Sequence, residues 1–226
     1  DDPVTAERLS PRDHGFGTRR VPLETNYYEV YNQANVELVD VREAPIQRIT
    51  RDGGQTSANS YEFDIIIYAT GFDAVTGSFD RIDISGSGGR KLKQAWQGGP
   101  TSFVGVMVEG FPNMFMVMGP HAALGNNPRS IEYNVEWVRD LIGHMDGQEL
   151  TVAAARPEAV EEWTGFVRQK AQGLLSNEID SWMTGVNMNV EGKQTRTLVR
   201  YSGTAPEYRE WCDEVAAKGY QELRLR

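Results

Sequence analysis

The adjacent arginines Arg19 and Arg20 are the strongest candidates for chemistry in this sequence. They lie in a stretch from Gly15 to Pro22 whose upstream glycines would let a ligand approach the backbone closely. Arginine stays protonated at any working pH and presents a planar fork of five N–H donors. One guanidinium could therefore hold a ligand phosphate while its neighbour opposes a reacting anion. The plainer alternative, two solvated surface arginines, is the commoner case for a bare dibasic pair.

Two turns rich in small residues could face a ligand. Ala69–Asp73 follows an apolar run directly, and Gly119–Pro128 stands between an apolar run and a helical pattern. In open α/β sheets ligands gather at the carboxyl ends of strands, so either turn could border a cofactor, with the amides of Asn126 and Asn127 at a helix start. Ordinary tight connections are the alternative. Trp182, in a helix-poor stretch, could stack on a ligand or belong to the core.

Apolar runs predict the strands that would position these turns. Phe63–Ala69 is β-branched and continuous, which is typical of a strand buried on both faces of an α/β sheet. Met114–Met118 predicts a second buried strand, and Val36–Val41 alternates well enough for a third, with Ile46–Ile49 as its partner. Thr197–Tyr201 could form an edge strand.

Three helices are predicted in the second half of the chain. Apolar residues recur at three and four positions between Ser130, the expected N-cap, and Gly147. Similar patterns begin at Pro157 and at Pro206, since proline is favoured in the first turn of a helix. On the first helix the recurring apolar residues are Ile131, Val135, Val138, Ile142 and Met145.

Composition narrows the possible partners. The 226 residues carry a formal charge of −9, 39% are hydrophobic, and the mean hydropathy is −0.50. An acidic surface repels nucleic acid and anionic lipid, so neither is an expected partner. No apolar run reaches the roughly 18 residues of a membrane span. The single cysteine, Cys212, fits a reducing compartment, and we expect a cytoplasmic protein.

Familiar catalytic motifs are missing from the chain. Gly86–Gly89 has Lys91 where the third glycine of a dinucleotide-binding turn belongs, so a hairpin tip is the better interpretation. The sequence holds no G-x-S-x-G elbow and no H-E-x-x-H, and its three histidines lack metal-ligand spacing. We therefore expect no metal site and find no support for a hydrolase.

Taken together, these segments resemble the C-terminal part of Baeyer–Villiger monooxygenases of the cyclohexanone monooxygenase type, which use FAD and NADPH. The resemblance runs over nearly the whole chain, and the order and spacing of its pieces are more specific than any one of them. The matching pieces are Pro11–His14, Thr18–Pro22, Asn26–Asn32, Ala69–Val75, Asp80–Asp83, Gly110–Pro120, Pro128–Glu132, Val135–Trp137 and Ser181–Trp182.

The resemblance implies an α/β fold made of the C-terminal portions of two interleaved Rossmann-like domains, with helices dominating the C-terminal half. Residues 1–68 would complete the NADP-binding domain, and residues 69–226 would form the C-terminal part of the FAD-binding domain, including a mobile loop near 181–195. Family members are more than twice as long and carry two G-x-G-x-x-G turns that are not found here. Because the sequence also begins without Met, we expect it to be a trailing half that needs its N-terminal half as partner and is inactive alone.

The resemblance also assigns roles to single residues. Arg20 matches an active-site arginine that opposes the negative charge of a C4a-peroxyflavin and then of the intermediate it forms with a ketone, which yields an ester or lactone. Arg19 matches a position usually held by Lys, which binds the 2′-phosphate of NADPH, and Trp182 matches a loop tryptophan that contacts NADP. Thr18 and Asn126 are further expected cofactor-binding residues. Leu124 and Asn127 match substrate-pocket positions, Asn127 being more polar than the aliphatic residue expected there.

Two alternatives remain open at this stage. The chain could be a catalytically incompetent fragment or an assembly subunit that binds a complementary half. A related flavoprotein that oxidises amines or sulfides is disfavoured, because the Thr18–Pro22 setting of Arg20 resembles the ketone-oxidising branch.

Overall fold

The computed structural model describes residues 2–226 and divides the chain into two compact units between Gly71 and Phe72. The residues up to Gly71 are called unit 1 and Phe72–Arg226 unit 2. The resemblance placed a domain boundary after residue 68, three residues earlier.

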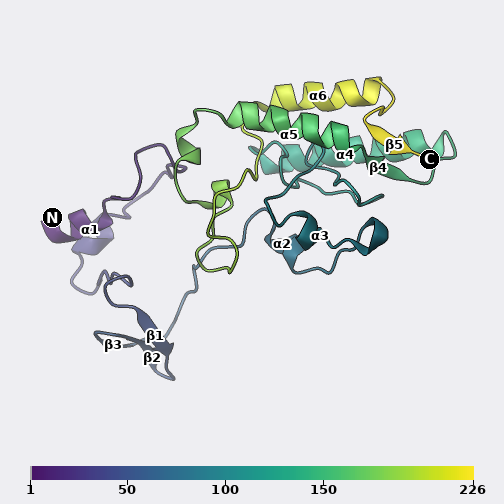
Figure 1. The fold of residues 1–226 in the computed structure, drawn as a ribbon. Helices are drawn as coiled ribbons and strands as arrows, with labels where there is room; N and C mark the ends of the chain where they lie inside the picture. The colour runs from purple at the N-terminus through teal and green to yellow at the C-terminus, as the bar shows by residue number, and fades with distance from the viewer. Residues whose placement is uncertain (1) are drawn as a thin grey trace. The chain divides into compact units, whose positions relative to one another are not determined.

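Unit 1 is built from short elements and holds a three-stranded antiparallel sheet in the order β1-β2-β3 (Figure 1). Gly53 permits a close approach between neighbouring strands, since a Cβ there would lie 1.9 Å from the carbonyl oxygen of Tyr61. None of the described residues of unit 1 is a buried hydrophobic side chain, so this unit has no apolar core of its own. Its elements are helix α1 (Pro3–Leu9), 3₁₀ helix η1 (Glu29–Asn32), and strands β1 (Ile46–Ile49), β2 (Gly53–Thr56) and β3 (Ser60–Glu62).

Three of the predicted strands are not formed. Phe63–Ala69 is exposed instead of buried, with Ile65 78% and Ile67 84% accessible. A strand buried on both faces needs a hydrogen-bonded neighbour at each edge and a layer on each face, and no described residue supplies them. Val36–Val41 is irregular, and its expected partner Ile46–Ile49 pairs with β2 instead. Met114–Met118 is largely irregular too, although the N–H of Met116 donates to the carbonyl of Val106 at 2.7 Å.

Unit 2 is dominated by helices, and Figure 1 shows α4, α5 and α6 lying alongside one another. The three predicted long helices are confirmed, and the predicted tip at Gly86–Gly89 is a tight turn between the bridged residues Ser85 and Lys91. The helices are α2 (Gly77–Asp80), α3 (Leu92–Ala95), α4 (Asn127–Asp146), α5 (Pro157–Ala171) and α6 (Ala205–Ala217), with 3₁₀ helices η2 (Ser87–Gly89), η3 (Leu175–Asn177) and η4 (Trp182–Thr184). Strands β4 (Ala153–Ala155) and β5 (Leu223–Leu225) form an antiparallel pair.

An aromatic cluster forms the centre of the core in unit 2. Trp163 of α5 is fully buried and stacks on Tyr201 with ring centroids 5.6 Å apart, while Tyr208 of α6 packs against it edge-on. The Tyr208 hydroxyl donates to the carbonyl of Val104 at 2.6 Å, and the Asn134 amide of α4 donates back to that hydroxyl at 3.1 Å. These bonds satisfy the hydroxyl of Tyr208, and they fix α4 and α6 to the chain around Val104. The buried indole N–H of Trp163 has no hydrogen-bond partner among the described residues.

Helix α4 differs from its prediction in its cap, and its buried face is not the row of recurring apolar residues. The side chain of Asn126, rather than Ser130, accepts the hydrogen bond from the N–H of Arg129. Of the recurring apolar residues, Met145 is buried and Val138 is partly buried, whereas Ile131, Val135 and Ile142 are 43–50% exposed. Asn134 lies on the buried face and makes hydrogen bonds there. Because this buried residue is polar, the buried face cannot be recognised from the spacing of apolar residues. The residues buried on α4 are Asn134, Trp137, Leu141 and Met145.

Candidate functional site

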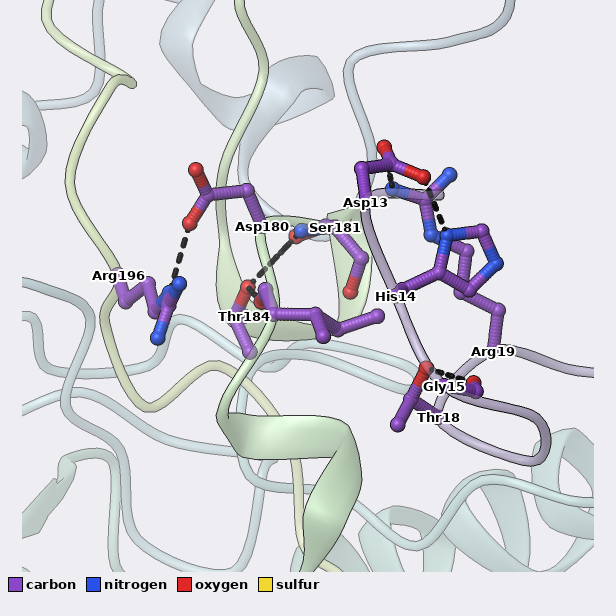
Figure 2. A network of polar contacts seen from close by, with 10 residues as sticks. Asp13, His14, Gly15, Thr18, Arg19, Asp180, Ser181, Thr184 and Arg196 are labelled. Carbon is purple, nitrogen blue, oxygen red and sulfur yellow. Dashed lines mark hydrogen bonds and ion pairs between the residues drawn. The ribbon is translucent and has the colours of Figure 1, made fainter. Parts of the chain in front are cut away.

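The loop that carries the two arginines starts with a tight turn in unit 1. The N–H and the hydroxyl of Thr18 both donate to the carbonyl of Gly15, the hydroxyl at 2.7 Å, as Figure 2 shows for the side chain. Gly17 has φ +80°, a conformation that glycine adopts without strain. Thr18 is buried by this turn, so Arg19 and Arg20 leave a firmly bonded point of the chain.

The two guanidinium groups have different surroundings. Arg19 lies 3.7 Å from a carboxylate oxygen of Asp13, which is itself hydrogen-bonded to His14 at 2.7 Å. The bond to His14, with a smaller contribution from Arg19, holds the pKa of Asp13 below its usual value. Arg20 is exposed and makes no hydrogen bond or ion pair with any residue that the structure describes. Its five donors are therefore available to an anion from outside.

In unit 2 the loop Gly119–Leu124 is held by a buried histidine. The N–H of His121 donates to the carbonyl of Val199 at 3.2 Å, and Nε2 lies 2.9 Å from the carbonyl of Leu198. Since a carbonyl only accepts, Nε2 carries the proton, and the buried Nδ1 has no partner within residues 2–226. Burial, which the Leu198 bond only partly offsets, lowers the pKa of His121.

The predicted substrate and cofactor residues of this loop lie at the start of α4. Leu124 is half-buried, whereas Asn126 and Asn127 are exposed. The side-chain oxygen of Asn126 caps α4, which leaves its amide NH₂ as the group free to meet a ligand. The structure thus brings these three residues to one helix N-terminus, where backbone N–H groups are also directed outward.

Trp182 opens the short helix η4 and is 50% exposed, so it is not a core residue. The turn beneath it is well bonded, since the Thr184 hydroxyl accepts from the N–H of Ser181 and Gly185 ends the helix with φ +74°. Close by, the guanidinium of Arg196 lies 2.6 Å from a carboxylate oxygen of Asp180 (Figure 2). The exposed indole therefore stands on a hydrogen-bonded turn.

One extended segment, Thr197–Tyr201, ties both loops of unit 2 together. The N–H of Thr197 donates to the carbonyl of Thr184 at 2.8 Å, next to Trp182. Further along, Tyr201 forms a parallel bridge with Ala123, beyond the His121 contacts. The predicted edge strand is reduced to these contacts, which hold the Trp182 turn and the Gly119–Leu124 loop to a common segment. Thr18, Arg19 and Arg20 belong to unit 1.

The structure also contains a cleft that the sequence did not reveal. It has a volume of about 680 Å³ in unit 2, and its walls include Asp73, Asp80, Lys93 and Lys193. The Lys193 ammonium is ion-paired with both aspartates. A pairing of residues 120 positions apart leaves no periodic or motif signal, and Lys193 entered the prediction only as part of the loop near 181–195.

The described residues offer neither a metal site nor a membrane-spanning helix. Within residues 2–226 no group of His, Cys, Asp or Glu could hold a metal ion. Over the same residues no helix has both the length and the apolar character needed to cross a membrane.

Comparison with known proteins gives a consistent result. No family model matches the chain. The 2-oxo-Δ³-4,5,5-trimethylcyclopentenylacetyl-CoA monooxygenase of Pseudomonas putida is 44% identical over 99% of the chain and 42% of its own length. A Baeyer–Villiger monooxygenase of Pseudooceanicola batsensis is 38% identical over 98% of the chain and 40% of its own length.

Solved structures agree with these relatives. The cyclohexanone monooxygenase from Rhodococcus sp. Phi1 bound to NADP⁺ superimposes with a TM-score of 0.91 at 39% identity. The OTEMO complex with FAD and NADP gives a TM-score of 0.84 at 42% identity. Each covers 100% of this chain, which spans 42% of theirs. By sequence and by structure, the chain is a homologue of the C-terminal part of the Baeyer–Villiger monooxygenases, and it spans about two fifths of their length.

Proposed function

We propose that this chain is part of an FAD- and NADPH-dependent monooxygenase that inserts one oxygen atom of O₂ beside a ketone carbonyl. The observation that carries the proposal is the exposed guanidinium of Arg20, which has no partner among the described residues and lies beside a firmly bonded turn, in a homologue of Baeyer–Villiger enzymes. In the balanced reaction, ketone, O₂, NADPH and a proton give an ester or lactone, NADP⁺ and water.

The residues present suit the nicotinamide coenzyme better than they suit FAD. An arginine fork fits a phosphate, and the half-exposed indole of Trp182 fits a planar ring. We assign Arg19, Thr18, Trp182 and the amide of Asn126 to the cofactors. The chain has no glycine-rich turn for the FAD pyrophosphate, so we propose that FAD is held mainly by an N-terminal part of the same enzyme. When bound, reduced FAD together with O₂ supplies the oxygen atom that is transferred.

Arg20 would act on the charge that develops during oxygen insertion. As the carbonyl carbon is attacked, its oxygen becomes an oxyanion, and a fixed guanidinium lowers the free energy of that state most in a site that excludes water. Leu124 and Asn127 would border the ketone. The exposed amide of Asn127 offers hydrogen-bonding groups and supports a substrate with a polar substituent.

The alternative proposal is that this polypeptide is an inactive fragment or an assembly subunit. It is supported by the share of its relatives that the chain spans, 42%, and by the missing phosphate-binding turns. A co-purifying chain with two G-x-G-x-x-G turns would support an enzyme made of two parts. For both the enzyme and the inactive fragment, we propose the cytoplasm as the compartment.

Substitution of Arg20 in the full-length protein tests the proposal. Arg20→Ala should lower the rate of ester or lactone formation by a hundredfold or more, about 3 kcal/mol of lost transition-state stabilisation, while flavin absorbance stays stoichiometric. Arg20→Lys should fail similarly, because an ammonium on a flexible stem does not reproduce the planar fork. The matched control is Arg42→Ala, which removes an exposed arginine of the same unit. Near-normal product formation by both Arg20 variants would remove Arg20 from the mechanism.

A further inference from the structure

A charge cluster in unit 2 joins two segments that lie 120 residues apart. The Nζ of Lys193 lies 2.7 and 2.9 Å from the two carboxylate oxygens of Asp73 and 2.7 Å from a carboxylate oxygen of Asp80. It also donates to the hydroxyl of Thr76 at 2.9 Å. The three charged side chains are only 13–23% exposed. Every proton of the ammonium is thus engaged, and the cluster is largely shielded from water.

The backbone is shaped to admit this cluster. A Cβ on Gly77 would lie 2.5 Å from both Cβ and Cγ of Asp73, so only glycine at position 77 leaves room for that carboxylate. Burial alone would lower the pKa of Lys193, but the hydrogen bonds that its ammonium donates to Asp73 and Asp80 outweigh burial and raise the pKa. The side chain therefore stays a cation that is matched by two carboxylates.

The same lysine closes the loop that starts at Trp182. The carbonyl of Lys193 accepts from the N–H of Asn187 at 2.8 Å, and its own N–H donates to the carbonyl of Val190 at 3.2 Å. On the near side, the N–H of Val186 donates to the carbonyl of Ser181 at 3.0 Å. A continuous chain of backbone bonds thus runs from the ammonium anchor to the turn that supports the indole.

We infer that Lys193 is a positioning residue: held by Asp73 and Asp80, it fixes the segment Ser181–Thr197 in the conformation that presents Trp182. Removing one partner of a shielded ion pair leaves like charges without compensation, unlike the loss of an exposed pair. In Lys193→Met the carboxylates of Asp73 and Asp80 would repel each other, and the segment would lose its anchor. That the indole meets a nicotinamide coenzyme rests on the proposed function, whereas the anchoring of the segment does not.

Hydrogen exchange of the full-length protein, followed by mass spectrometry, tests the anchor directly. In Lys193→Met the amides of peptides covering residues 181–197 should exchange roughly tenfold faster or more, the loss expected for a charge-assisted hydrogen bond. Lys193→Arg should restore most of the protection, because a guanidinium can bind two carboxylates. Gly77→Ala should also speed exchange, because it displaces Asp73 without changing any charge. The control Lys91→Met, which breaks the more exposed pair with Asp83, should leave these peptides unchanged.

Steady-state kinetics separate this inference from the proposed function. If Trp182 meets the coenzyme, Lys193→Met should raise KM for NADPH by about tenfold with little change in kcat. Faster exchange with an unchanged KM would confirm the positioning role and contradict the assignment of Trp182. Unchanged exchange in both Lys193→Met and Gly77→Ala would overturn the inference whatever the activity. If Lys193→Met fails to fold, Asp80→Asn replaces it, because Lys193 keeps Asp73 as a partner in that variant. Faster exchange of residues 181–197 in Asp80→Asn would support the inference, and unchanged exchange would overturn it.

Discussion

Arg19 and Arg20 are neighbours in the chain, yet their charges are available to different degrees. Arg19 shares its guanidinium with the carboxylate of Asp13, whereas Arg20 has no partner among the described residues. A phosphate that binds Arg19 must compete with Asp13, and an anion at Arg20 meets no such competitor. This difference agrees with the roles we propose, reversible binding of a coenzyme at Arg19 and stabilisation of a transient charge at Arg20.

Arg19 should set the preference for NADPH over NADH in the full-length protein. The two coenzymes differ only in the 2′-phosphate, and a charge-assisted hydrogen bond to it contributes about 1.5–3 kcal/mol. Arg19→Ala should therefore weaken NADPH binding roughly ten- to a hundredfold and leave NADH nearly unaffected. The measurement is KM for both coenzymes, with Arg42→Ala as control. Parallel changes for the two coenzymes, or none, would exclude the phosphate role.

His121 should make the stability of the protein depend on pH. Its pKa is lowered from 6.5, chiefly by burial, so the unfolded chain takes up a proton at a higher pH than the folded chain does. The stability that follows from this difference is present above about pH 6.5 and is lost as the pH falls through the folded pKa, at up to about 1.4 kcal/mol per pH unit. Urea unfolding between pH 8 and 5 should show a shallower loss for His121→Gln than for wild type. Equal slopes in wild type and His121→Gln would contradict the prediction.

At the scale of elements, the long helices could be read from the sequence, whereas among the predicted strands only Ile46–Ile49 is formed as a full strand, with a partner other than the expected one. α4, α5 and α6 have local signals, an apolar period and a proline in the first turn. A strand such as the one predicted at Phe63–Ala69 depends on neighbouring strands that are distant in sequence. Its residue types are typical of a buried strand, but in this structure the segment joins no sheet. The same reasoning explains Asn134, whose burial depends on a hydrogen bond to Tyr208 of another helix.

The candidate site was foreseen to a similar extent. The resemblance identified Arg19, Arg20 and Trp182, and their roles remain proposals. The ion pairs of Asp73 and Asp80 with Lys193 could not be predicted from the sequence. Pairs between charges far apart in the chain depend on the folded backbone and leave no pattern in the sequence.

Asn126 combines a structural role with a proposed ligand role, and substitution should separate them. Asn126→Ala removes the N-cap of α4 and should lower the free energy of unfolding by about 1 kcal/mol. Asn126→Ser keeps a capping oxygen but loses the amide NH₂, so it should retain stability while weakening coenzyme binding in the full-length protein. Urea unfolding and KM for NADPH check the two effects. Normal coenzyme binding in Asn126→Ser would show that Asn126 caps α4 and does not bind the coenzyme through its amide.

At the scale of the molecule, the apolar core is confined to unit 2. Among the described residues, every buried hydrophobic side chain lies between Leu92 and Leu223. Backbone that is not secured by a core opens at low free-energy cost and is cut first by proteases.

Limited proteolysis of the 226-residue chain should therefore proceed in two stages. We expect early cuts before Phe72 and a resistant product that contains α4, α5 and α6, resolved by mass spectrometry over a time course. The exposed loop around Glu191 is an internal standard, because it is accessible yet anchored through Lys193. Equal resistance of both units would show that unit 1 is secured by contacts other than buried apolar side chains.

The exposed run from Phe63 to Tyr68 has a consequence for the life of the polypeptide in a cell. The six residues comprise five of high β-propensity and one charged residue, Asp64, with neither proline nor glycine, and such segments stack between identical chains into cross-β fibrils. Asp64 acts as the single gatekeeper against that outcome. The fraction of newly made chains that is lost to aggregation depends on two quantities. They are the time for which the run stays exposed and the concentration of identical chains. Rapid covering during synthesis, or capture by a chaperone, would thus determine how much of this polypeptide survives to work.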